Sequence, residues 1–185
     1  KEVIERPPLP GGMAPAAAAV PVLETERLVL RAHTRADWED YRPILMSDRA
    51  QYMDGKLDQT GAWACFASEL ASWLLDDIGY WTAARKSDDK AVAFVGILHP
   101  SVYPETELGW MTTEEGEGQG YACEAAEAAL DWAFGSRGLT TLVSYIDPRN
   151  TRSIALAERL GASRDNEANR PEQDDLVYRH PRRAA

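Results

Sequence analysis

The sequence is poor in the residues that build metal and redox centres. Its 185 residues include two cysteines and three histidines, with neither a Cys-x-x-Cys pair nor a Cys/His cluster. Because a structural zinc site needs four such ligands close together, we expect no metal site. Cys65 and Cys123 fall in predicted helices, where an isolated cysteine usually serves as a small buried residue. His33, His99 and His180 show no spacing typical of a ligand set or a triad.

Long hydrophobic runs and an excess of positive charge are also absent. No run approaches the ~18 apolar residues of a membrane span. The formal net charge is −10, whereas nucleic acid binding needs a basic surface. We therefore expect a cytoplasmic protein, monomeric or homodimeric, with neither a membrane nor a nucleic acid partner. The negative charge suits a cationic amine substrate, although solubility explains it equally well.

The composition is that of one ordered domain. Apolar residues make up 44% of the chain, and the six tryptophans are spread along it, which is typical of a globular core. Residues 1–21 are rich in Pro, Gly and Ala without periodicity, so we interpret them as a disordered or vector-derived leader. We expect residues 22–185 to form a single domain.

The hydrophobic pattern predicts both strands and helices in that domain. Strands are expected at 28–30, 81–85, 91–98, 105–112, 140–146 and 175–178, and helices at 38–46, 60–74, 122–133 and 148–160. A polar turn at 86–90 joins two of the three central strands, which indicates an antiparallel meander. The order predicts an α/β (α+β) fold, a mixed sheet with helices packed on it.

A glycine-rich loop before the third helix carries the main functional signal. Gly116, Gly118 and Gly120 follow a strand and lead directly into a helix. The backbone can therefore turn with positive φ, and the helix N-terminus can meet a phosphate. The chain has no lysine after Lys90, which excludes a nucleoside-triphosphate loop. The Gly-x-Gly-x-Gly spacing, late in the chain, also differs from a dinucleotide fingerprint.

Four segments resemble, in their order along the chain, the GNAT acetyltransferases and in particular the ribosomal-protein N-terminal acetyltransferases. Glu117-Gly-Gln-Gly-Tyr-Ala resembles the coenzyme A loop Arg/Gln-x-x-Gly-x-Gly/Ala, with Glu117 in place of the usual Arg or Gln. Thr25-Glu-Arg-Leu-Val-Leu-Arg and Glu107-Leu-Gly-Trp resemble two strands of that subgroup. The segment from Asp147 to Ala162 resembles its Asn-x-x-Ser helix. The resemblance covers about residues 23–180.

The resemblance implies a GNAT-like mixed, mostly antiparallel sheet with helices packed on both faces. It further implies an N-acetyltransferase that moves an acetyl group from acetyl-CoA to a primary amine by direct attack. Backbone groups of the loop would hold the coenzyme's pyrophosphate, and two strand residues with one helix residue would hold its pantetheine arm. These cofactor-binding residues are Met111, Thr112, Gly118, Gln119, Gly120, Tyr121, Ala122 and Asn150.

Two side chains are candidates for the chemistry. Glu107 precedes Gly109, where a glycine inside a strand predicts a bulge, and it can serve as the general base or as a surface carboxylate. Ser153 would donate to the departing thiolate by the resemblance, or it is an ordinary helix residue. Asn150 is also a good N-cap, a role compatible with ligand binding. Tyr145 is more typical of a core residue than of a catalytic one.

The acceptor amine is not indicated by any motif. A protein N-terminus and a small amine, such as an antibiotic or a polyamine, are both compatible with the sequence. We expect the choice to depend on residues 50–77 and 166–173. A coenzyme-binding module without catalysis is the alternative from another class, and the presence of Glu107 and Ser153 disfavours it.

Overall fold

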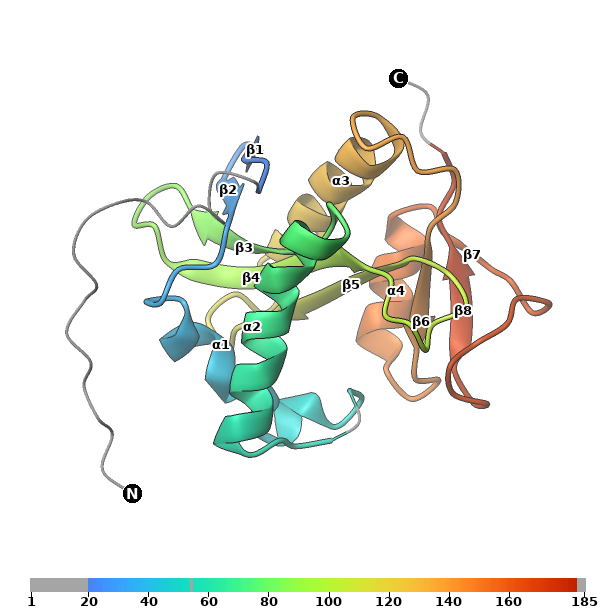
Figure 1. Cartoon of the computed structure of the whole chain (residues 1–185), viewed down its shortest axis with the longest axis horizontal. Coiled ribbons are helices and arrows are strands. Elements are labelled where there is room, and N and C mark those ends of the chain that lie inside the picture. The colour runs from blue at the N-terminus through green and yellow to red at the C-terminus, as the bar shows by residue number, and fades with distance from the viewer. Residues whose placement is uncertain (1–19, 54, 183–185) are drawn as a thin grey trace.

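A single eight-stranded sheet organises the protein in the computed structural model, which describes residues 20–53 and 55–182 (Figure 1). The spatial order is β1-β2-β3-β4-β5-β6-β8-β7, and every neighbouring pair is antiparallel except β5 and β6. The strands are β1 Leu23–Glu24, β2 Leu28–Arg31, β3 Tyr80–Arg85, β4 Ala91–Leu98, β5 Glu107–Thr112, β6 Val143–Ile146, β7 Ser163–Arg164 and β8 Leu176–Arg179.

Helices cover both faces of this sheet. They are α1 Trp38–Leu45, the 3-10 helix η2 Asp48–Ala50, α2 Gln59–Leu75, α3 Tyr121–Phe134 and α4 Thr151–Arg159. In Figure 1, α1 and α2 lie on the near side of the sheet and α3 on the far side. The predicted mixed, mostly antiparallel sheet and its helices are confirmed. The elements β1, β7 and η2 were not predicted, because two or three residues carry no readable period.

The far face is a close-packed apolar core. The stripe of alanines on α3 lies against β2, β4 and β5, and Ala125, Ala126 and Ala129 have no exposed surface. Because alanine is small, the helix approaches the sheet closely. Leu28 and Trp81 fill the space from the sheet side.

The near face differs, because it buries polar side chains among aromatic ones. Trp38 and Tyr41 of α1 pack with Phe66 of α2 against Phe94 of β4. His33, Thr82 and Glu69 are buried in or beside this cluster.

β5 and β6 separate soon after they meet. They pair at one position only, Glu107 opposite Val143. Beyond it, the Ser144 hydroxyl donates to the Leu108 carbonyl oxygen at 2.6 Å, so a side chain replaces the next backbone bond. This separation leaves an opening in the sheet beside β5, called here the β5–β6 opening.

The bulge predicted at Gly109 is wrong. The register of β4 and β5 is regular through Gly109, which lies opposite Gly96, and the register shift lies between Ala83 and Ala84 of β3. Gly109 is needed for another reason. A Cβ atom there would lie 2.1 Å from the Tyr80 hydroxyl oxygen, so the glycine makes room for the ring of Tyr80.

Two residues that were assigned above to the leader, Val20 and Pro21, pack against the domain. Val20 is buried, and the Pro21 carbonyl accepts a hydrogen bond of 2.8 Å from the Trp81 indole. Residues 1–19 of the predicted leader lie outside the described residues. Among residues 20–53 and 55–182, no helix has the length and apolarity to cross a membrane, and no group of His, Cys, Asp and Glu is arranged to hold a metal ion.

Candidate active site

The glycine loop has the geometry of an anion site. Gly118 and Gly120 have φ angles of 73° and 80°, and Gly120 is the N-cap of α3. A Cβ atom at Gly116 would lie 2.0 Å from the Val92 carbonyl oxygen, so this glycine allows close approach to β4. The first N–H groups of α3, at Tyr121 and Ala122, have no acceptor within the helix. They are available to a phosphate.

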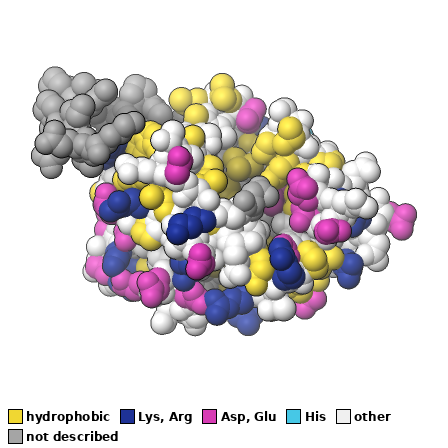
Figure 2. All heavy atoms as spheres, turned by 90° about the horizontal axis from the view of Figure 1, so that it is seen from below, with side chains coloured by type: hydrophobic (Ala, Val, Ile, Leu, Met, Phe, Trp, Pro, Cys, Tyr) yellow, Lys and Arg dark blue, Asp and Glu magenta, His cyan; other side chains and the backbone are white. Residues whose placement is uncertain are grey.

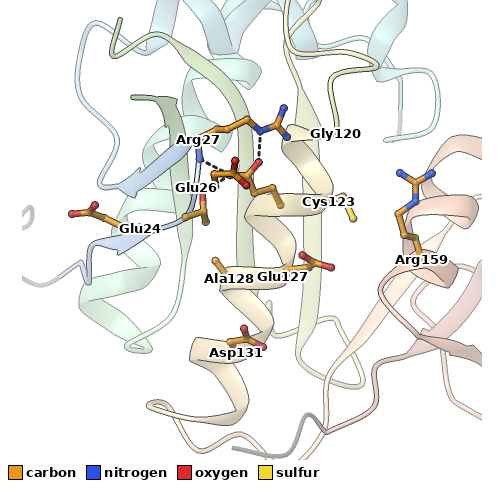
Figure 3. Close-up of a pocket in the computed structure, with 11 residues that line it drawn as sticks. Glu24, Glu26, Arg27, Gly120, Cys123, Glu127, Ala128, Asp131 and Arg159 are labelled. Carbon is orange, nitrogen blue, oxygen red and sulfur yellow. Dashed lines mark hydrogen bonds and ion pairs between the residues drawn. The ribbon is translucent and has the colours of Figure 1, made fainter. Parts of the chain in front are cut away.

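Arg27 fixes this loop from the start of β2. Its guanidinium donates to the Gln119 carbonyl oxygen at 3.0 Å and to Glu124 at 2.7 Å, and it lies 4.5 Å from the centre of the Tyr121 ring. Figure 3 shows Arg27 extended over the first turn of α3. The conformation of the loop therefore depends on a side chain 92 residues away in sequence, which local sequence patterns do not reveal.

The hollow in Figure 3, on one side of the loop, is acidic. Its lining includes Glu24, Glu26, Glu127 and Asp131, and its volume is about 650 Å³. Arg27 and Arg159 also line it, but a phosphate would meet an excess of carboxylates there. A phosphate is therefore better accommodated on the other side of the loop, toward the β5–β6 opening.

The edge of β5 that faces this opening presents the backbone of alternate residues. Thr113 N–H donates to the oxygen of Val92, directly opposite, at 3.2 Å. Because hydrogen-bonded pairs alternate in an antiparallel ladder, Met111 also points its backbone groups toward β4. The expected contact of Met111 with the pantetheine arm is therefore not favoured. Trp110 and Thr112 direct their backbone groups to the opening instead.

Glu107 lies half-buried at the point where β5 and β6 separate, on the near face of the sheet. Its carboxylate accepts a hydrogen bond of 3.4 Å from Tyr145 N–H. Burial, together with the negative charge of Asp175, raises the pKa of Glu107 to about 8. A carboxylate that loses its proton near pH 8 is suited to accept a proton from an amine.

Tyr80 lies close to Glu107, although no sequence pattern identifies it as part of the site. Its hydroxyl lies over Gly109, two residues along β5 from Glu107. Burial, with the nearby carboxylates of Glu69 and Glu107, raises the pKa of Tyr80 well above its ordinary value. The hydroxyl therefore stays protonated beside the candidate base.

A buried polar network extends from Tyr80 into the near face. Tyr41 OH donates to Glu69 at 2.8 Å, and the two ring nitrogens of His33 lie 2.8 Å from the Thr82 hydroxyl and 3.4 Å from the Glu69 carboxylate. His33 was expected to be a surface or satisfied residue, and it is satisfied and buried. These residues lie in β3, in α1, in α2 and in the segment after β2, so no sequence spacing connects them.

Asn150 and Ser153 occupy the first turn of α4. The Asn150 side chain accepts a hydrogen bond of 3.1 Å from Ser153 N–H, which confirms the predicted N-cap. The Trp110 indole N–H donates to the Ser153 hydroxyl oxygen at 3.2 Å. Because the indole can only donate, the Ser153 proton is left for another acceptor.

The two candidate catalytic side chains approach the opening from opposite faces. Side chains alternate along β5, so Glu107 lies on the near face and Trp110, with Ser153, on the far face. Tyr145 has a structural role, since its hydroxyl accepts a hydrogen bond of 3.2 Å from Glu105 N–H. Cys65 and Cys123 are half-buried rather than buried.

Known proteins match this chain in sequence and in fold. The acetyltransferase (GNAT) domain family matches residues 27–163. An acetyltransferase from Agrobacterium tumefaciens superposes with a TM-score of 0.84 and 39% identity, covering 96% of this chain and 99% of that one.

Two more distant structures share the fold. A ribosomal-protein alanine acetyltransferase from Vibrio fischeri has a TM-score of 0.67 and 18% identity, covering 88% of this chain and 97% of that one. A spermidine N-acetyltransferase from Vibrio cholerae, in complex with CoA and spermine, has a TM-score of 0.63 and 17% identity, covering 84% and 94%. The resemblance seen in the four sequence segments is therefore confirmed.

Proposed function

Because the chain belongs to the GNAT acetyltransferase family and is therefore an acyltransferase, we propose that it moves the acetyl group of acetyl-CoA to a primary amine by direct attack. The loop ending at Gly120 would hold the pyrophosphate through the free N–H groups of α3. The pantetheine arm would enter the β5–β6 opening along the edge of Trp110 and Thr112, where the Thr112 carbonyl oxygen already accepts a hydrogen bond from Arg49. The thioester would then lie between the two faces of the sheet.

The reacting groups then have defined tasks. The amine nitrogen attacks the thioester carbon, forming the C–N bond, and the C–S bond breaks to release the CoA thiolate. Glu107 accepts the proton that the amine loses, directly or through a water. A free N–H of β5 stabilises the oxyanion, and the Ser153 hydroxyl donates to the departing sulfur.

One observation carries this proposal more than any other. The β5–β6 opening has an anion-binding loop at one end and a carboxylate with a pKa of about 8 at its base. A site that only bound the coenzyme would need the loop and the free strand edge alone. Removing a carboxylate from water, even in part, is costly unless it serves a purpose, and proton acceptance from the amine is such a purpose.

The surroundings of Glu107 support a cationic amine as acceptor. The rings of Tyr103 and Tyr145 meet edge to face 5.4 Å apart on this side of the sheet. Burial is the main cause that raises the pKa of Tyr145, and the charges of Glu105 and Glu107 add to it. Once Glu107 has lost its proton, its carboxylate and the two tyrosine rings together attract an ammonium group.

Acetyl-CoA-dependent thiol release tests the proposal. The panel consists of peptides with free N-termini, polyamines and aminoglycosides, each at saturating acetyl-CoA. We expect release with at least one class and covalent acetylation of that amine by mass spectrometry. Binding of acetyl-CoA without acetylation of any amine in the panel would instead support the non-catalytic coenzyme module.

A further inference from the structure

Two arginines from distant parts of the chain meet at Glu117. Arg49, in η2, lies 2.7 Å from one carboxylate oxygen, and Arg152, in the first turn of α4, contacts the other. Glu117 occupies the position where an Arg or Gln would be expected in the resembled loop. The positive charge missing there is thus supplied by two side chains from outside the loop.

The two arginines are held to different degrees. Arg49 is 29% exposed, and its guanidinium also donates to the Thr112 carbonyl oxygen at 3.2 Å, on the edge of β5 that faces the opening. Its buried Nε has no hydrogen-bond partner among the described residues. The side chain of Arg152 is 81% exposed, with Glu117 as its recorded ion-pair partner. Arg152 can therefore leave the carboxylate at little cost.

Glu117 remains charged in this arrangement. The hydrogen bond from Arg49 is the main cause that lowers the pKa of Glu117. The carboxylate therefore offsets the repulsion between the two neighbouring guanidinium groups. Acidic and basic side chains are also mixed over the surface seen in Figure 2. A guanidinium binds phosphate with the same fork of N–H groups that it offers to a carboxylate.

We propose that Glu117 is an internal stand-in for phosphate and that Arg152 is a ligand of a coenzyme phosphate. In the free protein the carboxylate holds Arg152 at the mouth of the β5–β6 opening. When the coenzyme enters, a phosphate displaces Glu117 from Arg152, whereas Arg49 stays bound to Glu117 and to Thr112. This inference rests on the proposed function, because it assumes that the coenzyme phosphates lie at this loop.

The competing explanation is that the three side chains only clamp η2 and α4 to the loop. A second contact joins the residues that follow η2 to those that precede α4, since the Arg149 guanidinium lies 5.9 Å from the centre of the Tyr52 ring. The two explanations differ in the sign of one effect. Removing a competitor of phosphate tightens coenzyme binding, whereas removing a clamp loosens it.

Calorimetric titration of CoA, with phosphate-free pantetheine for comparison, separates them. We expect Arg152→Gln to weaken CoA binding about tenfold and Glu117→Gln to tighten it about three- to fivefold, with neither altering pantetheine binding. In the double variant the gain from Glu117→Gln should disappear. Glu114→Gln and Arg164→Gln, exposed residues that lose the same charges, are the matched controls and should leave CoA binding unchanged.

Three results would overturn the inference. They are weaker CoA binding by Glu117→Gln, unchanged binding by Arg152→Gln, and a gain from Glu117→Gln that persists without Arg152. Each of them leaves the proposed function standing if the wild type binds CoA and releases thiol. Failure of the wild type to bind CoA would instead remove the proposed function, so the two failures are distinguishable.

Discussion

The face of the sheet covered by α3 packs alanine, leucine and tryptophan side chains against apolar strands, whereas the face covered by α1 and α2 buries His33, Glu69 and Thr82 among its aromatic rings. Both faces belong to the same strands and use the same alternation of side chains. The first is explained by stability alone. The second carries buried ionisable groups whose desolvation opposes folding.

The contrast supports the proposal that the reaction takes place on the polar face. Sequence rules of a well-packed domain are usually broken at functional sites, and under α1 and α2 they are broken by the buried His33, Glu69 and Thr82. Glu107 and Tyr80 are the members of that face nearest the β5–β6 opening. Substitution of Glu107 should therefore alter turnover, and substitutions in the apolar core under α3 should alter stability.

The largest effect is expected from Glu107→Gln. Loss of one general base lowers turnover by roughly 100- to 10,000-fold without weakening acetyl-CoA binding. Wild-type turnover should rise with pH through about 8, where Glu107 loses its proton, and the variant should lack this rise. Steady-state kinetics from pH 6 to about 9.5 check it. An identical pH profile in both proteins would assign the proton path to water alone.

The same carboxylate should affect stability with a defined sign. The pKa of Glu107 is raised from 4.5 to about 8 in the folded protein, so the folded state keeps a proton that the unfolded state loses between these values. Its contribution to stability is present below pH 4.5 and is lost as the pH rises to about 8. Denaturant unfolding should show this decline in the wild type and not in Glu107→Gln.

On the apolar face, Ala129→Leu should act on stability instead. Ala129 is fully buried between α3 and the sheet, so the added carbon atoms overpack the core and cost about 1–3 kcal/mol. Turnover well below the melting temperature should stay near wild type. Ala155→Leu, at an exposed position of α4, is the control. A larger loss of turnover than of stability would contradict the division between the faces.

Gly109→Ala tests whether Gly109 is needed to make room for Tyr80, beside the candidate base Glu107. The new Cβ would meet the Tyr80 hydroxyl at 2.1 Å, which predicts a loss of about 1–3 kcal/mol. The loss should be smaller in a Tyr80→Phe background, because the clashing oxygen is gone. A double-mutant cycle of unfolding free energies measures this coupling. Additive losses would show that Gly109 serves another purpose.

Ser153→Ala should give the smallest change in stability. Serine-to-alanine slightly favours the helix, but the variant also leaves the Trp110 indole N–H without its acceptor, a cost of about 1 kcal/mol. If the hydroxyl donates to the leaving thiolate, turnover falls while acetyl-CoA affinity is preserved. Wild-type turnover with an altered melting temperature would make Ser153 a structural residue.

Local signals predicted the backbone geometry of the glycine loop and of the two helix starts beside it. The glycine loop, the start of α3 and the Asn150 cap depend on residues that are adjacent in sequence, and the structure has them where expected. Each is determined by backbone conformation and hydrogen bonds within a few residues. Most strands of the sheet could be predicted for the same reason, because apolar and polar residues alternate clearly along them.

The features that could not be predicted depend on packing between residues that are distant in sequence. The bulge at Gly109 was wrong because the constraint comes from Tyr80, on a strand two places away in the sheet. The link between Arg49, Glu117 and Arg152 joins three elements that share no motif. Such juxtapositions follow from the fold as a whole and cannot be read from spacing.

The central claim is that the coenzyme's pyrophosphate binds at the N-terminus of α3, and calorimetric titration of acetyl-CoA into the wild type and Gly120→Asp tests it directly. Gly120 has a φ of 80° and is the N-cap of α3. Aspartate there adds strain and a negative charge against the phosphates. We predict measurable binding to the wild type and loss of at least about tenfold in affinity for the variant, with its circular dichroism spectrum unchanged. Equal affinity in the two proteins would contradict the account.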